Sequence, residues 1–163
     1  MVEINGIAHV ILSVSNWEAC RGFYEKLLSF FGMTRTFDGE DMVYFVGGRT
    51  AIGIPARLVG GLILKAGSKC DPAYEHERFI QTRPGLHHVC LRVRDEQAVR
   101  DVHDFLVSIK ATIVHGPEEG TWAPGYYSVL FEDPIGTRIE VNHVPGQGLL
   151  APGAAFNPSG DYR

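Results

Sequence analysis

A repeated strand sequence is the feature that most constrains the fold of this chain. The segment IAHVILSV, residues 7–14, aligns with LHHVCLRV, residues 86–93, at an offset of 79 residues, and places His9 on His88. Three apolar residues are also identical in this alignment: Val10 and Val89, Leu12 and Leu91, Val14 and Val93. Because four identities in eight positions can arise by chance between two strands, the flanking sequence must decide whether the repeat is real.

An amphipathic helix is predicted at the same distance after each of these strands. After the first strand, Asn16 is a candidate N-cap, an apolar stripe runs through residues 17–31, and Gly32 is a stop signal. After the second strand, Asp95 is a candidate N-cap for an apolar stripe over residues 98–109. The offset of 79 residues aligns the two stripes, so the repeat extends beyond the strands.

The two modules also end alike. Residues 43–54 (VYFVGGRTAIGI) and 129–141 (VLFEDPIGTRIEV) both predict a strand, a glycine-containing turn and a second strand. With a short strand near residues 34–37 and near 112–115, each module is predicted to have the order β-α-β-β-β. We therefore expect an α+β fold in which two βαβββ modules of one chain form a curled mixed sheet.

The predicted organisation is a single domain covering residues 1–163. Module one spans about residues 4–57 and module two about residues 85–145, with a connecting segment at 58–84 and an irregular tail at 146–163. The apolar sequence LVGGLILKAG within the connecting segment is either an additional strand or an apolar loop.

Bulk composition predicts an ordinary soluble globular protein without nucleic-acid or membrane partners. The net charge of −4 gives no basic footprint for nucleic acid or an anionic membrane surface. No apolar run is long enough to span a bilayer, and no signal peptide is evident. The three cysteines form no C-x-x-C pair, which indicates free thiols in a reducing compartment, and we expect a cytoplasmic location.

Strand alternation places three polar residues on one face of the predicted sheet. The valine and leucine side chains of the repeated strands must face the helices, which need an apolar surface for burial. His9, His88 and Glu140 therefore lie on the opposite, concave face, and His87, one residue out of phase, lies at the strand entry on the helix side. Other candidates on the concave face, for substrate binding, are Ser13, Arg92 and Asn142.

The convergence of these groups predicts a metal site. A single strand histidine is more often a hydrogen-bonded structural residue, and a lone glutamate is more often a surface residue. Two histidines and one glutamate on one face, however, form the donor set of a facial triad, which suits Fe²⁺ and also Zn²⁺, Ni²⁺ or Mn²⁺. Arg92 and Arg138 could each bind a substrate carboxylate in bidentate fashion, or could simply be exposed or paired with acidic residues. Cys90 is expected to be a small buried filler.

The chain resembles the vicinal oxygen chelate superfamily, which includes glyoxalases, extradiol dioxygenases and bleomycin-resistance proteins. The resemblance covers about residues 4–145 through IAHVILSV, FYEKLLSFFGM, GLHHVCLRV and YYSVLFEDPIGTRIEV. It implies a divalent metal held by His9, His88 and Glu140, with Glu140 also in a catalytic role, and a homodimeric assembly. The family's fourth ligand position falls on Gly53, which cannot coordinate a metal through a side chain.

This departure leaves the reaction open. Two histidines and one glutamate resemble the extradiol dioxygenase arrangement, but the acid–base histidine of those enzymes has no counterpart before the DP segment. Tyr126 or Tyr127 could replace it in part, although aromatic packing is the simpler interpretation of both. The leading hypothesis is a metal-dependent lyase, isomerase or dioxygenase acting on a small substrate with vicinal oxygens. The alternative is a non-catalytic drug- or metabolite-binding protein of the bleomycin-resistance type.

Overall fold

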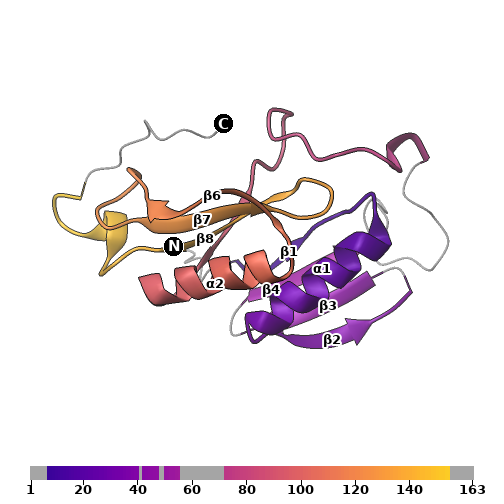
Figure 1. Cartoon of the computed structure of the whole chain (residues 1–163), viewed down its shortest axis with the longest axis horizontal. Helices are drawn as coiled ribbons and strands as arrows, with labels where there is room; N and C mark the ends of the chain where they lie inside the picture. The colour runs from indigo at the N-terminus through magenta and orange to yellow at the C-terminus, as the bar shows by residue number, and fades with distance from the viewer. Residues whose placement is uncertain (1–6, 41, 48–49, 56–71, 155–163) are drawn as a thin grey trace, which may run out of the picture. The chain divides into compact units, whose positions relative to one another are not determined.

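The computed structural model describes residues 7–40, 42–47, 50–55 and 72–154 of the 163-residue chain. These residues divide into two compact units, one within Met1–Arg78 and the other within Phe79–Arg163. Each unit combines one α-helix with four strands (Figure 1), so the expected α+β class is confirmed. The segment at 58–67, predicted as a strand or an apolar loop, lies outside the described residues.

The N-terminal unit packs one helix on a four-stranded sheet with the order β1-β4-β3-β2. Strand β1 runs parallel to β4, and the other neighbours are antiparallel. The strand expected over residues 7–14 is shorter than predicted, because only three of its residues pair with β4. The elements are β1 (His9–Ile11), α1 (Trp17–Phe30), β2 (Thr34–Asp38), β3 (Met42–Gly47), β4 (Thr50–Pro55) and the 3-10 helix η1 (Pro72–Tyr74).

Helix α1 begins and ends where its sequence predicts. The Asn16 side chain accepts a hydrogen bond from the backbone N–H of Ala19 at 3.1 Å, which caps the first turn. The helix ends before Gly32, whose φ of 71° is the left-handed conformation that favours glycine at this position. On β1 and the segment after it, His9 is exposed, whereas Leu12 and Val14 are buried, as the predicted alternation requires.

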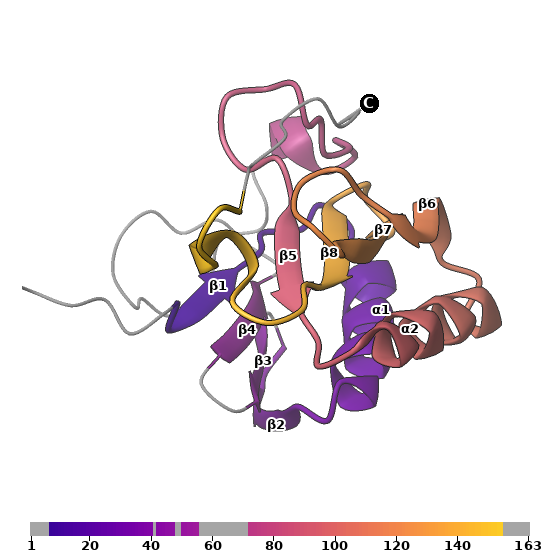
Figure 2. The ribbon, with the colours of Figure 1, turned by 90° about the vertical axis from the view of Figure 1, so that its left-hand side faces the viewer.

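The C-terminal unit has the sheet order β5-β8-β7-β6. Strand β5 runs parallel to β8, and the β8–β7 and β7–β6 pairs are antiparallel. Figure 2 shows β5 and β8 side by side. The elements are β5 (Val89–Arg92), α2 (Glu96–Ser108), β6 (Thr112–Glu119), β7 (Tyr127–Glu132), β8 (Arg138–His143) and the 3-10 helix η2 (Gly148–Leu150).

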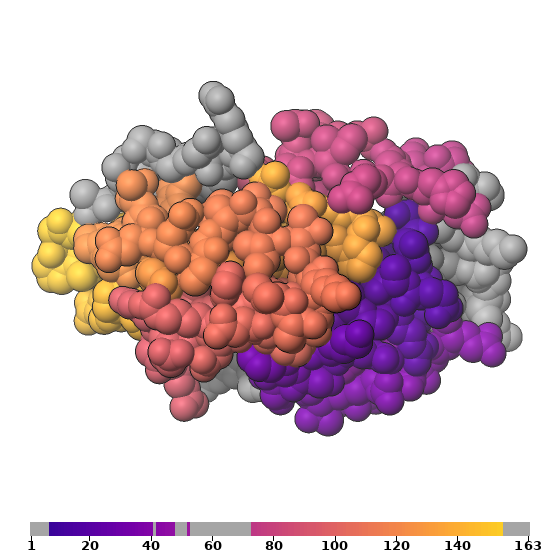
Figure 3. All heavy atoms as spheres, viewed as in Figure 1, coloured from indigo at the N-terminus to yellow at the C-terminus, as the bar shows by residue number. Residues whose placement is uncertain are grey.

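Helix α2 covers the apolar face of this sheet. The Asp95 carboxylate caps it by accepting a hydrogen bond from the backbone N–H of Ala98 at 2.8 Å. The helix packs on β6, β7 and β8, and its atoms lie directly against those of β6 in the space-filling view (Figure 3). The buried side chains at this contact are apolar and come from both layers: Val99, Val102, Leu106, Val129, Phe131, Ile139 and Val141.

The hydrogen-bonded strands form two sheets rather than one. Each sheet contains one parallel and two antiparallel pairs, so the predicted mixture of strand directions is present in each unit. No helix among the described residues is long and apolar enough to cross a membrane.

Candidate functional site

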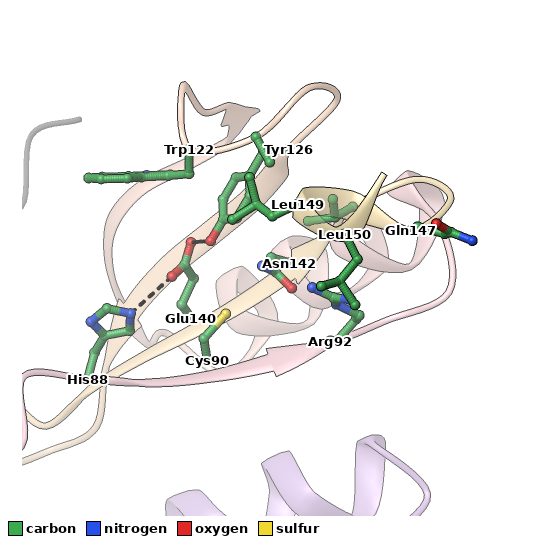
Figure 4. Close-up of a pocket in the computed structure, with 12 residues that line it drawn as sticks. His88, Cys90, Arg92, Trp122, Tyr126, Glu140, Asn142, Gln147, Leu149 and Leu150 are labelled. Atoms are coloured by element: carbon green, nitrogen blue, oxygen red, sulfur yellow. Dashed lines mark hydrogen bonds and ion pairs between the residues drawn. The ribbon is translucent and has the colours of Figure 1, made fainter. Parts of the chain in front are cut away.

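A pocket of about 390 Å³ lies on the face of the C-terminal sheet opposite α2 (Figure 4). Its floor comes from the parallel pair β5 and β8, whose register sets Cys90 opposite Glu140 and Arg92 opposite Asn142. Residues opposite one another in a sheet point to the same face, so these four side chains share one surface. The pocket is lined by His88, Cys90, Arg92, Trp122, Ala123, Tyr126, Glu140, Asn142, Val144, Gln147, Leu149 and Leu150.

His88 and Glu140 form a close pair in this pocket. The Nε2 atom of His88 lies 3.2 Å from Oε2 of Glu140, and both side chains are largely shielded from solvent. His88 lies immediately before β5 and continues the side-chain alternation of that strand, so it faces the pocket on the same side as Cys90. The sequence-based assignment of both residues to the face opposite the helix is therefore confirmed in this unit.

His87 is a neighbour of this pair and does not line the pocket. Its Nδ1 atom lies 2.8 Å from Nδ1 of His88. Burial, together with the charges of His88 and Arg138, lowers the pKa of His87. A neutral His87 can share a hydrogen bond with His88 without placing a positive charge beside it.

Tyr126 holds the other oxygen of the carboxylate. Its hydroxyl donates a hydrogen bond of 2.6 Å to Oε1 of Glu140. Burial alone would raise the pKa of Glu140, but hydrogen bonds from His88, Tyr126 and Ser128 outweigh it, so this pKa lies below its ordinary value. Burial and the hydrogen bond to Glu140 raise the pKa of Tyr126. The site thus keeps an ionised carboxylate beside a neutral phenol at neutral pH.

Cys90 lines the floor of the pocket between its two ends. The sequence-based prediction that Cys90 is buried is wrong, because the residue is exposed. Its thiol lies in the pocket beside Glu140 and Tyr126. Desolvation by burial and the adjacent Glu140 carboxylate raise the pKa of the thiol to about 12. Cys90 is therefore a neutral, weakly polar part of the floor at physiological pH.

A turn built around Asp133 positions β8 and hence Glu140. The buried carboxylate of Asp133 accepts hydrogen bonds from the backbone N–H groups of Ile135, at 3.0 Å, and Thr137, at 2.8 Å. Gly136 adopts a φ of 92° in the same turn, which a side chain would strain. The DPIGTRIE sequence therefore has a structural role: it fixes the hairpin that carries Glu140.

Four of the six predicted site residues lie together in one pocket, and the other two belong to the other unit. His88, Arg92, Glu140 and Asn142 line the pocket of the C-terminal unit. The other two predicted residues, His9 and Ser13, belong to the N-terminal unit. Within either unit, the described residues include no group of three or more His, Cys, Asp or Glu side chains that could hold a metal ion.

Two aromatic residues contribute more to the pocket than their sequence pattern predicts. Tyr126 was assigned to aromatic packing as the simpler interpretation, yet it bonds to Glu140, and Trp122 lines the pocket above the pair. A signal for Tyr126 was available: it precedes β7 in phase with Ser128, which pairs with Asn142 on the pocket face. Tyr127, on the opposite phase, is buried and donates a hydrogen bond to the carbonyl of Pro117.

The family of the chain is evident from its sequence. Residues 6–141 match the sequence model of the Glyoxalase/Bleomycin resistance protein/Dioxygenase superfamily. The chain belongs to this superfamily. A search of curated proteins returned no match.

Solved structures of the superfamily share the fold. A glyoxalase-family protein of Bacillus halodurans is 19% identical, with a TM-score of 0.69 over 86% of this chain and 96% of its own. Lactoylglutathione lyase of Agrobacterium tumefaciens is 22% identical, with a TM-score of 0.58 over 86% of this chain and 94% of its own. A glyoxylase/bleomycin resistance protein/dioxygenase domain of Frankia is 18% identical, with a TM-score of 0.62 over 86% and 98%. At these identities the likeness is evidence of fold alone.

Proposed function

We propose that this protein is a divalent-metal-dependent enzyme of the glyoxalase/dioxygenase type that acts on a small organic substrate with vicinal oxygens. The observation that carries the proposal is the 3.2 Å separation between His88 Nε2 and Glu140 Oε2. Two donor atoms bound to one metal at about 2.1 Å lie about 3.0–3.4 Å apart in octahedral or tetrahedral geometry. The pair therefore has the spacing of two ligands on a shared ion.

The donor set also fits a metal chemically. Glu140 carries a pKa below its ordinary value, so its carboxylate is ionised at neutral pH, and imidazole with carboxylate suits Fe²⁺, Zn²⁺, Ni²⁺ or Mn²⁺. The third protein ligand in the proposal is His9, which the internal repeat aligns with His88 and which is exposed on β1.

Each residue of the pocket has a distinct part in the proposed chemistry. A divalent metal would act as a Lewis acid that polarises the two substrate oxygens. Glu140 contributes negative charge and accepts a proton through its carboxylate, while Tyr126 holds Oε1 of that carboxylate in a fixed orientation. Arg92, Asn142 and Ser13 are the proposed substrate-binding residues.

Metal analysis tests this proposal directly. Protein purified without added metal, then titrated with Fe²⁺, Zn²⁺, Ni²⁺ and Mn²⁺, should bind about one equivalent of at least one ion. The change His88→Ala should abolish this binding because it removes one of three protein ligands. The matched control His103→Ala removes a histidine from the surface of α2 and should leave binding intact. Binding below about a tenth of an equivalent to every ion would refute the proposal.

The second candidate is a non-catalytic binding protein of the bleomycin-resistance type. The apolar wall of the pocket, made by Trp122, Leu149 and Leu150, favours ligand binding that needs no metal. The two candidates differ in one measurement. A ligand that binds equally well with and without a chelator, to protein that holds no metal and shows no turnover, supports the binding protein.

A further inference from the structure

The two ends of the pocket differ in chemistry. His88, Glu140 and Tyr126 gather at one end, whereas Arg92 lies toward the other end of the floor (Figure 4). His88 and Arg92 are four positions apart in the chain, which corresponds to about 13 Å along an extended strand. A ligand that spans the pocket therefore meets two separate polar groups, with Cys90 between them.

Arg92 is a cation with no partner among the described residues. Its side chain makes no hydrogen bond and no ion pair there, although its guanidinium faces the pocket near Asn142 (Figure 4). Two other arginines are neutralised: Arg21 pairs with Asp38 and Arg100 pairs with Glu96. A guanidinium is always protonated and offers a planar pair of donors that matches a carboxylate. An unpaired arginine that lines a pocket is positioned to bind an external anion.

The wall above the floor is apolar and incompletely covered. Helix η2 places Leu149 and Leu150 over the pocket, where 47% and 87% of their surfaces are exposed. Trp122 supplies a flat indole over the end that holds His88. A ligand with an apolar body would remove this surface from water, which is a favourable contribution to binding.

We propose that the pocket binds a small organic monocarboxylate, whose carboxylate pairs with Arg92 and whose apolar body lies between Trp122 and Leu150. A monoanion matches the single guanidinium, whereas the dianionic charge of a phosphate would be disfavoured by the Glu140 carboxylate nearby. This inference rests on the proposed function in one respect. The end of the ligand remote from its carboxylate is taken to carry the oxygens that meet His88 and Glu140. Asn142, which lies beside Arg92 on the neighbouring strand, is a second donor for the carboxylate.

A fluorescence titration tests the proposal with simple probes. The change Trp17→Phe leaves Trp122 as the one tryptophan, because the chain has two. The probe pair is 3-phenylpropionate and its neutral amide, 3-phenylpropanamide, which differ in charge and hardly in shape, and phenyl phosphate supplies the dianion. The variant Arg92→Gln removes the proposed anion partner, and Arg94→Gln is a matched control that removes an exposed arginine outside the pocket.

The affinity of the pocket for the probes should depend on probe charge, and this dependence should require Arg92. The carboxylate should bind about 10- to 100-fold more tightly than the amide, and Arg92→Gln should erase this difference, because a charged hydrogen-bonded pair is lost. Arg94→Gln should preserve it. Equal binding of acid and amide, an equal effect of both arginine changes, or tighter binding of phenyl phosphate would each overturn the proposal.

A parallel metal titration keeps this test separate from that of the proposed function. His88→Ala should abolish metal binding yet retain the preference of the pocket for the carboxylate over the amide. If the unmodified protein binds no metal but prefers the carboxylate to the amide, the proposed metal enzyme is refuted and the proposed anion site is supported. Metal binding without any carboxylate preference refutes the anion site alone.

Discussion

The hydrogen bond between Tyr126 and Glu140 is the most informative contact of the pocket to perturb. The change Tyr126→Phe removes the hydroxyl that donates to Oε1 at 2.6 Å and keeps the aromatic ring. Glu140 is only 8% exposed, so water cannot fully replace the lost donor. The variant therefore leaves one oxygen of a shielded carboxylate with a missing partner, while His88 still faces the other oxygen.

The magnitude follows from the charge of the acceptor. A hydrogen bond to a charged group contributes about 1.5–3 kcal/mol to stability, so the free energy of unfolding should fall by that amount at pH 7. The pKa of Glu140 should rise in the variant, because one of the hydrogen bonds that lower it is gone. Its depressed pKa stabilises the folded protein above the unfolded-state value near 4.5, and this contribution is lost as pH falls through the folded-state pKa. Once Glu140 is protonated, the cost of Tyr126→Phe should shrink to about 0.5–1.5 kcal/mol, as for a neutral hydrogen bond.

Urea unfolding followed by Trp122 fluorescence measures these energies in the unit that contains the pocket. The measurements are made in the Trp17→Phe background at pH 7 and at a pH below the folded-state pKa of Glu140. Tyr74→Phe is the control, since Tyr74 is 49% exposed and outside the pocket. A double-mutant cycle with Glu140→Gln isolates the pairwise energy. A cost of Tyr126→Phe that is the same with and without Glu140→Gln would refute the coupling.

Other groups of the C-terminal unit give further tests. Because the pKa of the Cys90 thiol is about 12, its alkylation at pH 8 should be more than about a hundredfold slower than that of a free cysteine. The change Glu140→Gln should accelerate this alkylation, because the Glu140 carboxylate helps to raise the pKa of the thiol. Site-resolved mass spectrometry measures both rates. Asp133→Ala should lower the free energy of unfolding by about 2–5 kcal/mol, because two backbone N–H groups lose their acceptor at a residue only 3% exposed, whereas Asp133→Asn should cost less. Asp95→Ala should cost about 1 kcal/mol in the same unfolding assay through loss of the α2 cap, and no change would contradict that role.

Local sequence signals predicted the helices because each signal acts within one turn. Asn16 and Asp95 were identified as N-caps from residue type and position, and each side chain accepts the expected backbone hydrogen bond. Strand alternation likewise placed His88 and Glu140 on the pocket face, since side-chain phase needs no knowledge of the partner strand. These parts of the fold and site depend on contacts close in sequence.

Features that depend on tertiary contacts were predicted less well. The strand at 112–115 extends to Glu119, because its irregular pairing with β7 continues past two register shifts that no local pattern reveals. Cys90 was expected to be buried because cysteine usually is, but the pocket opens beside it. The bond from Tyr126 to Glu140 depends on the path of the chain before β7, which strand phase alone does not specify.

The contact between His87 and His88 determines which ring nitrogens can carry protons. Their Nδ1 atoms are 2.8 Å apart, so one must be protonated and the other must accept. When His88 donates from Nε2 to Glu140, its neutral ring accepts at Nδ1, and His87 is the Nδ1–H tautomer. If His88 instead offers the Nε2 lone pair to an electrophile, its proton moves to Nδ1 and His87 must become the Nε2–H tautomer. Binding of a metal or another electrophile to Nε2 of His88 is therefore coupled to a tautomer exchange in His87. The ¹⁵N chemical shifts of the two imidazole rings would report this exchange, although His87 itself does not line the pocket.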